Sequence, residues 1–281
     1  YWWTNDDDAE DTSSDALQAF TSDGFTIDDY ADFANLNANT NTYVSWNWLA
    51  GTAPTADNSA GAGATPTAGS VKIDGSNLGS ALAGTIAATR LTANTTSGFS
   101  IVLYEGTGSN ATVAHGLSAA PELIIIKSLE LDQNSIVYAG VSGVIDATDY
   151  VMLTDDRALA DDNTIWNDTA ATSTVFSIGT SNNPNTDNSD YIAYCFHSVE
   201  NYCKVGTYKG NGNADGSFVF TGFRPAFVIM KNTAADQAWV MMDNKRNTYN
   251  VMNGRLYPSD GDAENTGSNI LDFASNGFKL R

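Results

Sequence analysis

The chain contains one segment twice, and this repeat restricts the folds that are open to it. Tyr104–Gln133 aligns without a gap with Tyr208–Gln237, at an offset of 104 residues, and eight of the 30 positions are identical. The identities include two glycines, a proline, a lysine and a closing Asp-Gln pair. Within each copy a proline, an apolar run and a lysine follow one another, as "PELIIIK" at Pro121–Lys127 and "PAFVIMK" at Pro225–Lys231. The shared order of these residues indicates a duplication.

Each of these short segments is predicted to be a central β-strand. Proline is tolerated at the first position of a strand, where the missing N–H costs no ladder hydrogen bond. The four or five apolar residues that follow are typical of a strand covered on both faces. The lysine is expected to end the run by returning the chain to solvent.

A second element extends the repeat. "STVFSIG" (Ser173–Gly179) resembles "SDGFTID" (Ser22–Asp28) and "SNGFKLR" (Ser275–Arg281). After the first two come a loop rich in Asn, Asp and Thr and then an aromatic segment, Thr42–Trp48 or Asp190–Phe196. Apolar and polar residues alternate in Thr42–Trp48, which is the period of a half-buried strand. The sequence therefore predicts the end of one unit, one whole unit and most of another.

The remaining patterns favour an all-β fold. Further strands are expected at Gly98–Tyr104, Ser135–Ala139, Tyr150–Leu153, Cys203–Tyr208, Trp239–Met242 and Val251–Leu256. The best helical pattern is "TSSDALQAF", with Ser14 or Thr12 as its N-cap. Short strands separated by frequent Gly and Asn turns are typical of antiparallel β-sandwiches.

Composition suggests where the units begin and end. The segment 51–97 is rich in Ala, Gly, Thr and Ser and has no counterpart between the later units, so we expect a linker that is flexible at least in part. From Val71 onward it is better patterned and is expected to pack along a neighbouring unit or chain. The predicted organisation is the C-terminal part of a preceding unit at 1–50, the linker at 51–97, a complete unit at 98–200 and a second, truncated unit at 201–281.

The charge excludes some classes of partner. There are 33 acidic and 13 basic residues, a net charge of −20, whereas binding of nucleic-acid phosphates needs clustered Lys and Arg. No apolar run approaches the roughly 20 residues of a membrane span. Cys195 and Cys203 are either buried small hydrophobes or one disulfide, and the first is favoured.

Acidic clusters raise the question of metal binding and of catalysis. They are Asp6, Asp7 and Asp8; Asp28, Asp29 and Asp32; and Asp155, Asp156, Asp161 and Asp162. Calcium is one interpretation, since Ca²⁺ takes six to eight oxygen ligands. Solvated turns of an acidic protein are the favoured alternative. Glycoside hydrolysis by Asp155 and Asp156 is disfavoured, because a polar loop does not raise the pKa of one carboxyl. No catalytic residue, metal ligand or cofactor is predicted.

Histidine and tryptophan offer few further candidates. His115 and His197 have no partner at ligand spacing, and His115 aligns with Val219 in the second copy, so His115 is expected to be structural. Trp46 and Trp48 are expected in the core. Trp166 lies in the polar loop "DDNTIWNDT" and is the candidate for an exposed binding contact.

On these segments the chain resembles a known group of proteins. The similar segments are "SDGFTID" with "NTYVSWNWLAG", "APELIIIKS", "KVGTYKGNGNADGSFVFTGFRPAFVIMK" and "YIAYCF". They resemble segments of the repeated β-sandwich domains in tail-fibre and other virion appendage proteins of marine bacteriophages. The resemblance covers Asp23–Ala50 and Gly98–Arg281. It implies tandem sandwiches of concanavalin-like or immunoglobulin-like type, and it brings no active-site residues with it.

The expected function follows from that resemblance. It is a non-enzymatic, extracellular virion protein, a tail-fibre or appendage segment that spaces or presents a host-binding surface. Its expected partners are copies of itself in a homotrimer, other virion proteins, and a glycan or protein of the host surface. The alternatives are a tailspike-type polysaccharide depolymerase and a secreted bacterial adhesin.

Overall fold

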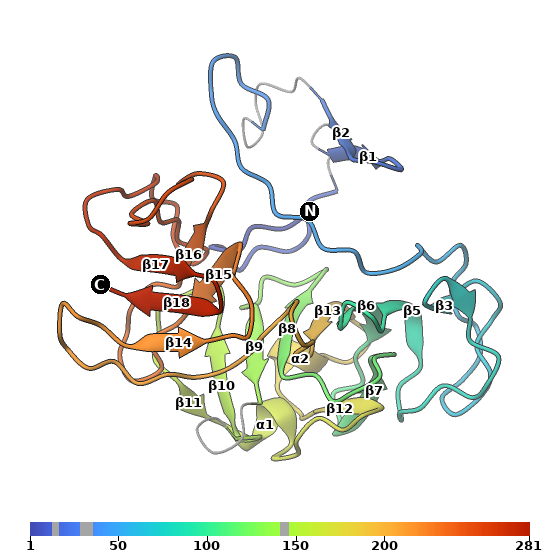
Figure 1. The fold of residues 1–281 in the computed structure, drawn as a ribbon. Helices are drawn as coiled ribbons and strands as arrows, with labels where there is room; N and C mark the ends of the chain where they lie inside the picture. The colour runs from blue at the N-terminus through green and yellow to red at the C-terminus, as the bar shows by residue number, and fades with distance from the viewer. Residues whose placement is uncertain (13–16, 29–35, 141–145) are drawn as a thin grey trace.

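The computed structural model describes residues 1–12, 17–28, 36–140 and 146–281, and over these residues the fold is all-β, as predicted (Figure 1). Several antiparallel sheets make up the structure. The two helices in the described ranges, α1 (Asn163–Trp166) and α2 (Asn182–Asn185), are single turns. Neither has the length or the apolar character that a membrane span requires.

The largest sheet has nine strands, and β13 lies in its middle between β6 and β8. All its pairs are antiparallel except β3 with β5. In spatial order the strands are β11 (Ala160–Asp161), β10 (Asp149–Met152), β9 (Ile136–Ala139), β8 (Leu123–Ser128), β13 (Asp190–Phe196), β6 (Phe99–Glu105), β5 (Ala88–Asn94), β3 (Val71–Ile73) and β4 (Ser76–Asn77). A two-stranded sheet, β7 (Ala111–Ala114) with β12 (Val175–Ile178), contributes to the same core.

Alternation along β13 explains this core. Tyr191, Ala193 and Cys195 point inward, while the residues between them are less buried. The ring of Tyr191 stacks on Tyr104 of β6, with 5.4 Å between the centroids. The hydroxyl of Tyr104 donates to the carbonyl of Pro184 at 2.7 Å, so this buried polar group is satisfied. Both cysteines are free, as favoured from the sequence.

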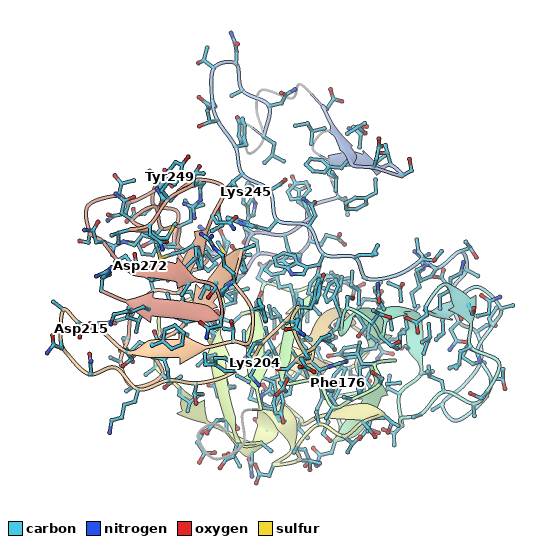
Figure 2. The ribbon with its side chains drawn as sticks, in the orientation of Figure 1. Phe176, Lys204, Asp215, Lys245, Tyr249 and Asp272 are labelled. Atoms are coloured by element: carbon cyan, nitrogen blue, oxygen red, sulfur yellow. The ribbon has the colours of Figure 1, made fainter. Side chains whose placement is uncertain are left out.

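The C-terminal strands enclose a separate core. They are β14 (Phe218–Phe220), β18 (Gly277–Leu280) and β17 (Leu271–Ala274) in one sheet, and β15 (Phe227–Met230) with β16 (Val240–Asp243) in another. Their core comprises Met242, Met252, Leu271, Phe273 and Phe278. In Figure 2, Phe176 marks the larger core and Asp272 marks β17 in this C-terminal group. A hairpin of β1 (Leu17–Phe20) and β2 (Phe25–Ile27) stands apart from both (Figure 1).

The strand pairing reproduces the repeat. In the β8–β9 pair, Leu123 lies opposite Ala139; in the β15–β16 pair, Phe227 lies opposite Asp243, and every other pair is likewise displaced by 104 residues. A turn that precedes the strand pair within each copy is also shared. Gly108 and Gly212 both have left-handed backbones, with φ of +62° and +65°, which a side chain would strain. The two "P-apolar-K" segments are therefore strands with one register. Only β8 is a central strand as predicted, between β9 and β13; among the described residues β15 pairs with β16 alone.

The segment 51–97, expected as a linker, forms strands from Val71 onward, in the part with the better sequence pattern. This segment supplies β3, β4 and β5 to the large sheet, and β5 pairs along its whole length with β6. Ala88, Leu91 and Ala93 are fully buried. The small residues of β5 pack closely against the core. The part from Val71 onward is expected to pack along a neighbouring unit, and β5 does pair with β6, at the start of the 98–200 unit.

Some predicted elements differ from the observed ones. The strands expected at Thr42–Trp48 and Cys203–Tyr208 are absent, and Val251–Leu256 forms only isolated bridges. A strand pattern needs a hydrogen-bonded partner, and the first two segments have no partner strand in the described ranges, whereas Val251–Leu256 bridges β16 and β17 at single residues. Leu17–Phe20 is a strand and not part of a helix; Ser14 lies outside the described residues. The predicted strands at β6, β9, β10 and β16 are present with ends displaced by about one residue.

His115 occupies a different place in the repeat from the one expected. Val113 pairs with Phe176, as Val219 pairs with Phe278, so His115 corresponds to Thr221 rather than to Val219. The gapless alignment missed this because the preceding loop is two residues longer in the second copy. The two residues form the same turn. Leu117 N–H donates to His115 Nδ1 at 3.1 Å, and Phe223 N–H donates to Thr221 Oγ1 at 3.4 Å.

This buried histidine makes stability depend on pH. Burial lowers the pKa of His115 to about 4 from an ordinary 6.5, although its bond to the Thr172 carbonyl opposes the shift. Protonation would also remove Nδ1 as an acceptor. Because the pKa of His115 is lower in the folded than in the unfolded state, folding favours the neutral imidazole. Its contribution to the free energy of unfolding is complete above pH 6.5, and about 3 kcal/mol of it is lost as the pH falls toward 4.

The His115→Thr variant, which copies Thr221, should lack this part of the pH dependence when unfolding is measured with urea from pH 4 to 7. Equal dependence in both proteins would contradict the assignment.

Candidate functional site, a buried lysine bound by a hairpin

The lysine that ends β8 is buried instead of returning to solvent. Lys127 is 0% exposed, and its Nζ donates to the backbone carbonyls of Gln133 and Asp7, each at 2.7 Å. Gln133 belongs to the loop that follows β8. Asp7 lies 120 residues upstream in the chain. The ammonium group therefore joins two segments that are distant in sequence.

Two more hydrogen bonds hold the same two segments together. Ala9 N–H donates to Oδ1 of Asp132 at 3.1 Å, and Glu10 N–H donates to the carbonyl of Leu129 at 3.0 Å. We call Lys127–Gln133 the first lysine loop. The segment Tyr1–Asp11, which is closed by a bond from Asp11 N–H to the Tyr1 carbonyl, is the first hairpin.

The same contact occurs again at the end of β15. Lys231 Nζ donates to the carbonyls of Gln237 at 2.9 Å and Asp156 at 3.0 Å, and also to that of Asn232. This second lysine loop, Lys231–Gln237, is bound by a second hairpin, Tyr150–Ala160, formed by β10 and β11.

The two flanking bonds recur as well. Ala158 N–H donates to Oδ1 of Asp236 at 2.9 Å, and Leu159 N–H donates to the carbonyl of Thr233 at 3.0 Å. The loop residues are displaced by 104 positions from the first contact and the hairpin residues by 149. Four hydrogen bonds thus repeat between corresponding atoms.

Desolvation and acidic neighbours act in opposite directions on these lysines. Burial lowers the pKa of Lys127, while the carboxylates of Asp7, Asp132, Asp6 and Asp8 oppose that shift. Burial likewise lowers the pKa of Lys231, opposed by Asp156, Asp155 and Asp236. A buried ammonium is costly unless hydrogen bonds replace its water. Here backbone carbonyls replace it, and surrounding carboxylates favour the charged form.

Apolar side chains accompany the second polar contact. Val137 of β9, Val151 of β10 and Leu153 form one cluster with Trp239, which precedes β16. The indole Nε1 of Trp239 donates to the carbonyl of Met152 at 2.7 Å, so its polar atom is satisfied. Ile229, Leu159, Leu123, Ile125 and Trp2 pack around this cluster. Packing against the larger sheet thus extends from the first hairpin to the C-terminal strands.

The structure gives several residues of the acidic clusters a local role. The exposed carboxylates of Asp6, Asp7 and Asp8 lie with their oxygens within 4.8 Å of one another, beside the Lys127 ammonium. Asp155 accepts from the Arg157 side chain at 2.6 Å, and Asp162 caps α1 through Thr164 N–H at 2.8 Å. Asp29 and Asp32 lie outside the described residues.

Trp166 is not an exposed contact. It is 1% exposed, and its ring meets that of Tyr138 edge to face with 5.4 Å between the centroids. The Asp162 cap starts a helical turn, and the last residue of that turn points into the core. Polar neighbours in the sequence concealed this. Of the two tryptophans expected in the core, Trp46 is half-buried and Trp48 is exposed. Both pack against Phe227 at the start of β15.

Sequence reasoning missed the hairpins although a signal was present. Asp6–Ala9 reads Asp-Asp-Asp-Ala and Asp155–Ala158 reads Asp-Asp-Arg-Ala, so the two acidic clusters share a pattern and its spacing. The lysine, Asp and Gln of the loops were already among the repeat's identities. The sequence does not show that each hairpin binds one of these lysine loops.

One protein family matches almost all of this chain. A family model described as a domain of unknown function, DUF7483, matches residues 2–75 and 68–281. The chain belongs to the DUF7483 family. No curated protein and no solved structure matches it. The paired lysine contacts are therefore the feature of this DUF7483 chain from which its role is best inferred.

Replacing each lysine of the DUF7483 chain should release its own hairpin only. In Lys127→Met two carbonyls lose a charged donor, which we expect to cost about 1–3 kcal/mol. Amide hydrogen exchange should then become faster at Ala9 and Glu10 but not at Ala158 and Leu159. Lys231→Met should show the reverse pattern, so that each variant serves as the control for the other. Acceleration at both hairpins in both variants would contradict two independent contacts.

Proposed function

We propose that this chain is a non-enzymatic structural segment of an extracellular virion appendage, such as a tail fibre, that spaces or presents a host-binding surface. The recurrence of the lysine contact at corresponding positions is the observation that carries the proposal. A fibre is built from units that follow one another in a fixed orientation. Contacts of one kind, repeated from unit to unit, supply that orientation.

The contact is suited to joining tandem units. Two separate cores lie on either side of the Trp239 cluster, one beneath the nine-stranded sheet and one among the C-terminal strands. Apolar packing at that cluster supplies affinity without direction. The ammonium and its carbonyl acceptors add direction, because a hydrogen bond requires a narrow geometry. We therefore interpret the repeat as tandem sandwich units held in register by these lysines.

The nucleophile and base candidates are poorly suited to catalysis. A cleft of about 420 Å³ is lined by Cys203, Lys204 and Glu200 among others. Burial raises the pKa of the Cys203 thiol and so disfavours the thiolate that a nucleophile requires. His115 is buried and neutral, with both ring nitrogens engaged in the fold. These observations support a binding or structural role over the depolymerase.

Partners follow from the same proposal. Copies of this chain and other virion proteins would form the appendage, and a glycan or protein of the host surface would be its target. A homotrimer is the assembly we favour, since closed symmetric oligomers are common among structural proteins. The net charge of −20 favours solubility and gives no surface for nucleic acid.

The purified chain should bind host cells or their envelope glycan without shortening the glycan. Binding is measured by cell pull-down and shortening by the release of reducing ends. Asp155→Asn and Asp156→Asn should leave both readouts unchanged. Release of reducing ends that either substitution abolishes would contradict the proposal in favour of the depolymerase, and absence of binding would limit the chain to a spacing role.

A further inference from the structure

The chain contains a third hairpin of the same build, Arg255–Asn265. Arg255 N–H donates to the Asn265 carbonyl at 3.1 Å, and Asn265 N–H donates back to the Arg255 carbonyl at 3.0 Å. Its closing residues are ten positions apart, as they are in the first hairpin, Tyr1–Asp11, and in the second, Tyr150–Ala160. This hairpin lies in the long connection between β16 and β17 (Figure 1).

The turn inside this hairpin matches the other two. Aligned on their closing residues, all three have an aspartate at the sixth position and an alanine at the ninth. The aspartate's Oδ1 accepts from the backbone N–H two residues later in each case. These bonds are Asp8 to Asp6 at 3.3 Å, Arg157 to Asp155 at 3.0 Å, and Asp262 to Asp260 at 3.2 Å. The third turn therefore has the conformation that binds a lysine loop elsewhere.

Its binding groups are unoccupied. In the first two hairpins a lysine loop contacts the carbonyl of the seventh residue and the N–H groups of the ninth and tenth. In the third, the corresponding groups are Gly261 O, Ala263 N and Glu264 N. Within the described part of the chain none of them has a hydrogen-bond partner, and residues 260–264 are all exposed. Asn5 of the first hairpin lies near Gly261 but makes no hydrogen bond to any of these three groups.

We propose that the third hairpin is a docking site for the lysine loop of a further unit of this kind. The occupant is a lysine at the end of an apolar strand, with a backbone carbonyl two residues later and an aspartate five residues later. This description is taken from Lys127, Leu129 and Asp132 and is repeated by the second loop. Both lysine loops of this chain are already bound, so the occupant is a loop outside it.

An apolar surface accompanies the third hairpin, as one accompanies the second. Met241 of β16 is paired with Leu256 at the start of the third hairpin. This pair corresponds to Val137 and Val151, which are paired in the Trp239 cluster at the start of the second hairpin. Met241 and Leu256 are half-buried, whereas Val137 and Val151 are buried beneath the next strands. An incoming unit would cover this pair. The inference rests on the three hairpins and does not depend on the proposed function.

The test follows the third hairpin in the complete, ¹⁵N-labelled chain. The probe is unlabelled chain that lacks residues 1–12, in which the first lysine loop is no longer bound. Adding it should shift the amide signals of Ala263 and Glu264 and slow their exchange with solvent. The signals of Ala158 and Leu159, whose sites are occupied, should not change. If circular dichroism shows the probe to be unfolded, a synthetic peptide of residues 229–239 takes its place.

Matched variants identify the contact. Lys127→Met in the shortened probe, or Lys231→Met in the peptide, should weaken binding about tenfold or more, because the charged donor is lost. Asp260→Ala in the labelled chain should weaken it through loss of the turn. Asp215→Ala, another exposed aspartate (labelled in Figure 2), should have no effect. Unchanged Ala263 and Glu264 signals with both probes, or equal shifts from the methionine variant, would overturn the proposal.

Discussion

The buried ammonium of Lys127 is the constraint on which the arrangement of this chain depends. An ammonium removed from water requires acceptors, and the loop after β8 supplies the Gln133 carbonyl. The other acceptor, Asp7 O, belongs to a hairpin far away in sequence. Folding of the β8 end is therefore coupled to docking of that hairpin. The acidic residues around it have the sign that favours a cation, which gives part of the strongly negative composition a structural purpose.

The lysine contact occurs twice, and each copy joins a hairpin to a lysine loop that is distant in sequence. Each hairpin precedes, in chain order, the lysine loop that it binds, so the contacts all run in one direction. Apolar packing around Trp239 brings the larger sheet and the C-terminal strands together. The lysine then selects one register among the many that apolar surfaces would allow. In the appendage that we propose, direction and register together would fix how successive units are oriented.

The sequence predicted those strands and turns that are specified by neighbouring residues. The apolar runs of β8 and β15 and the duplicated glycine turns are visible without a structure. Burial of Lys127 is not visible, because one acceptor lies 120 residues away. Thr42–Trp48 has a strand's alternation but lacks a partner strand among the described residues. The better pattern from Val71 onward indicated packing but not a strand; β5 is a paired strand in which alanine and threonine are core residues.

The central claim is tested most directly by the reactivity of the seven lysines toward an acylating reagent in the native state, followed by peptide mass spectrometry. The account predicts that Lys127 is acylated only on unfolding and that Lys231, which is half-buried, reacts at an intermediate rate. Lys204 and Lys245, both exposed, should react first (Figure 2). Acylation of Lys127 as fast as that of Lys204 would show that its ammonium is in solvent, and would contradict the account.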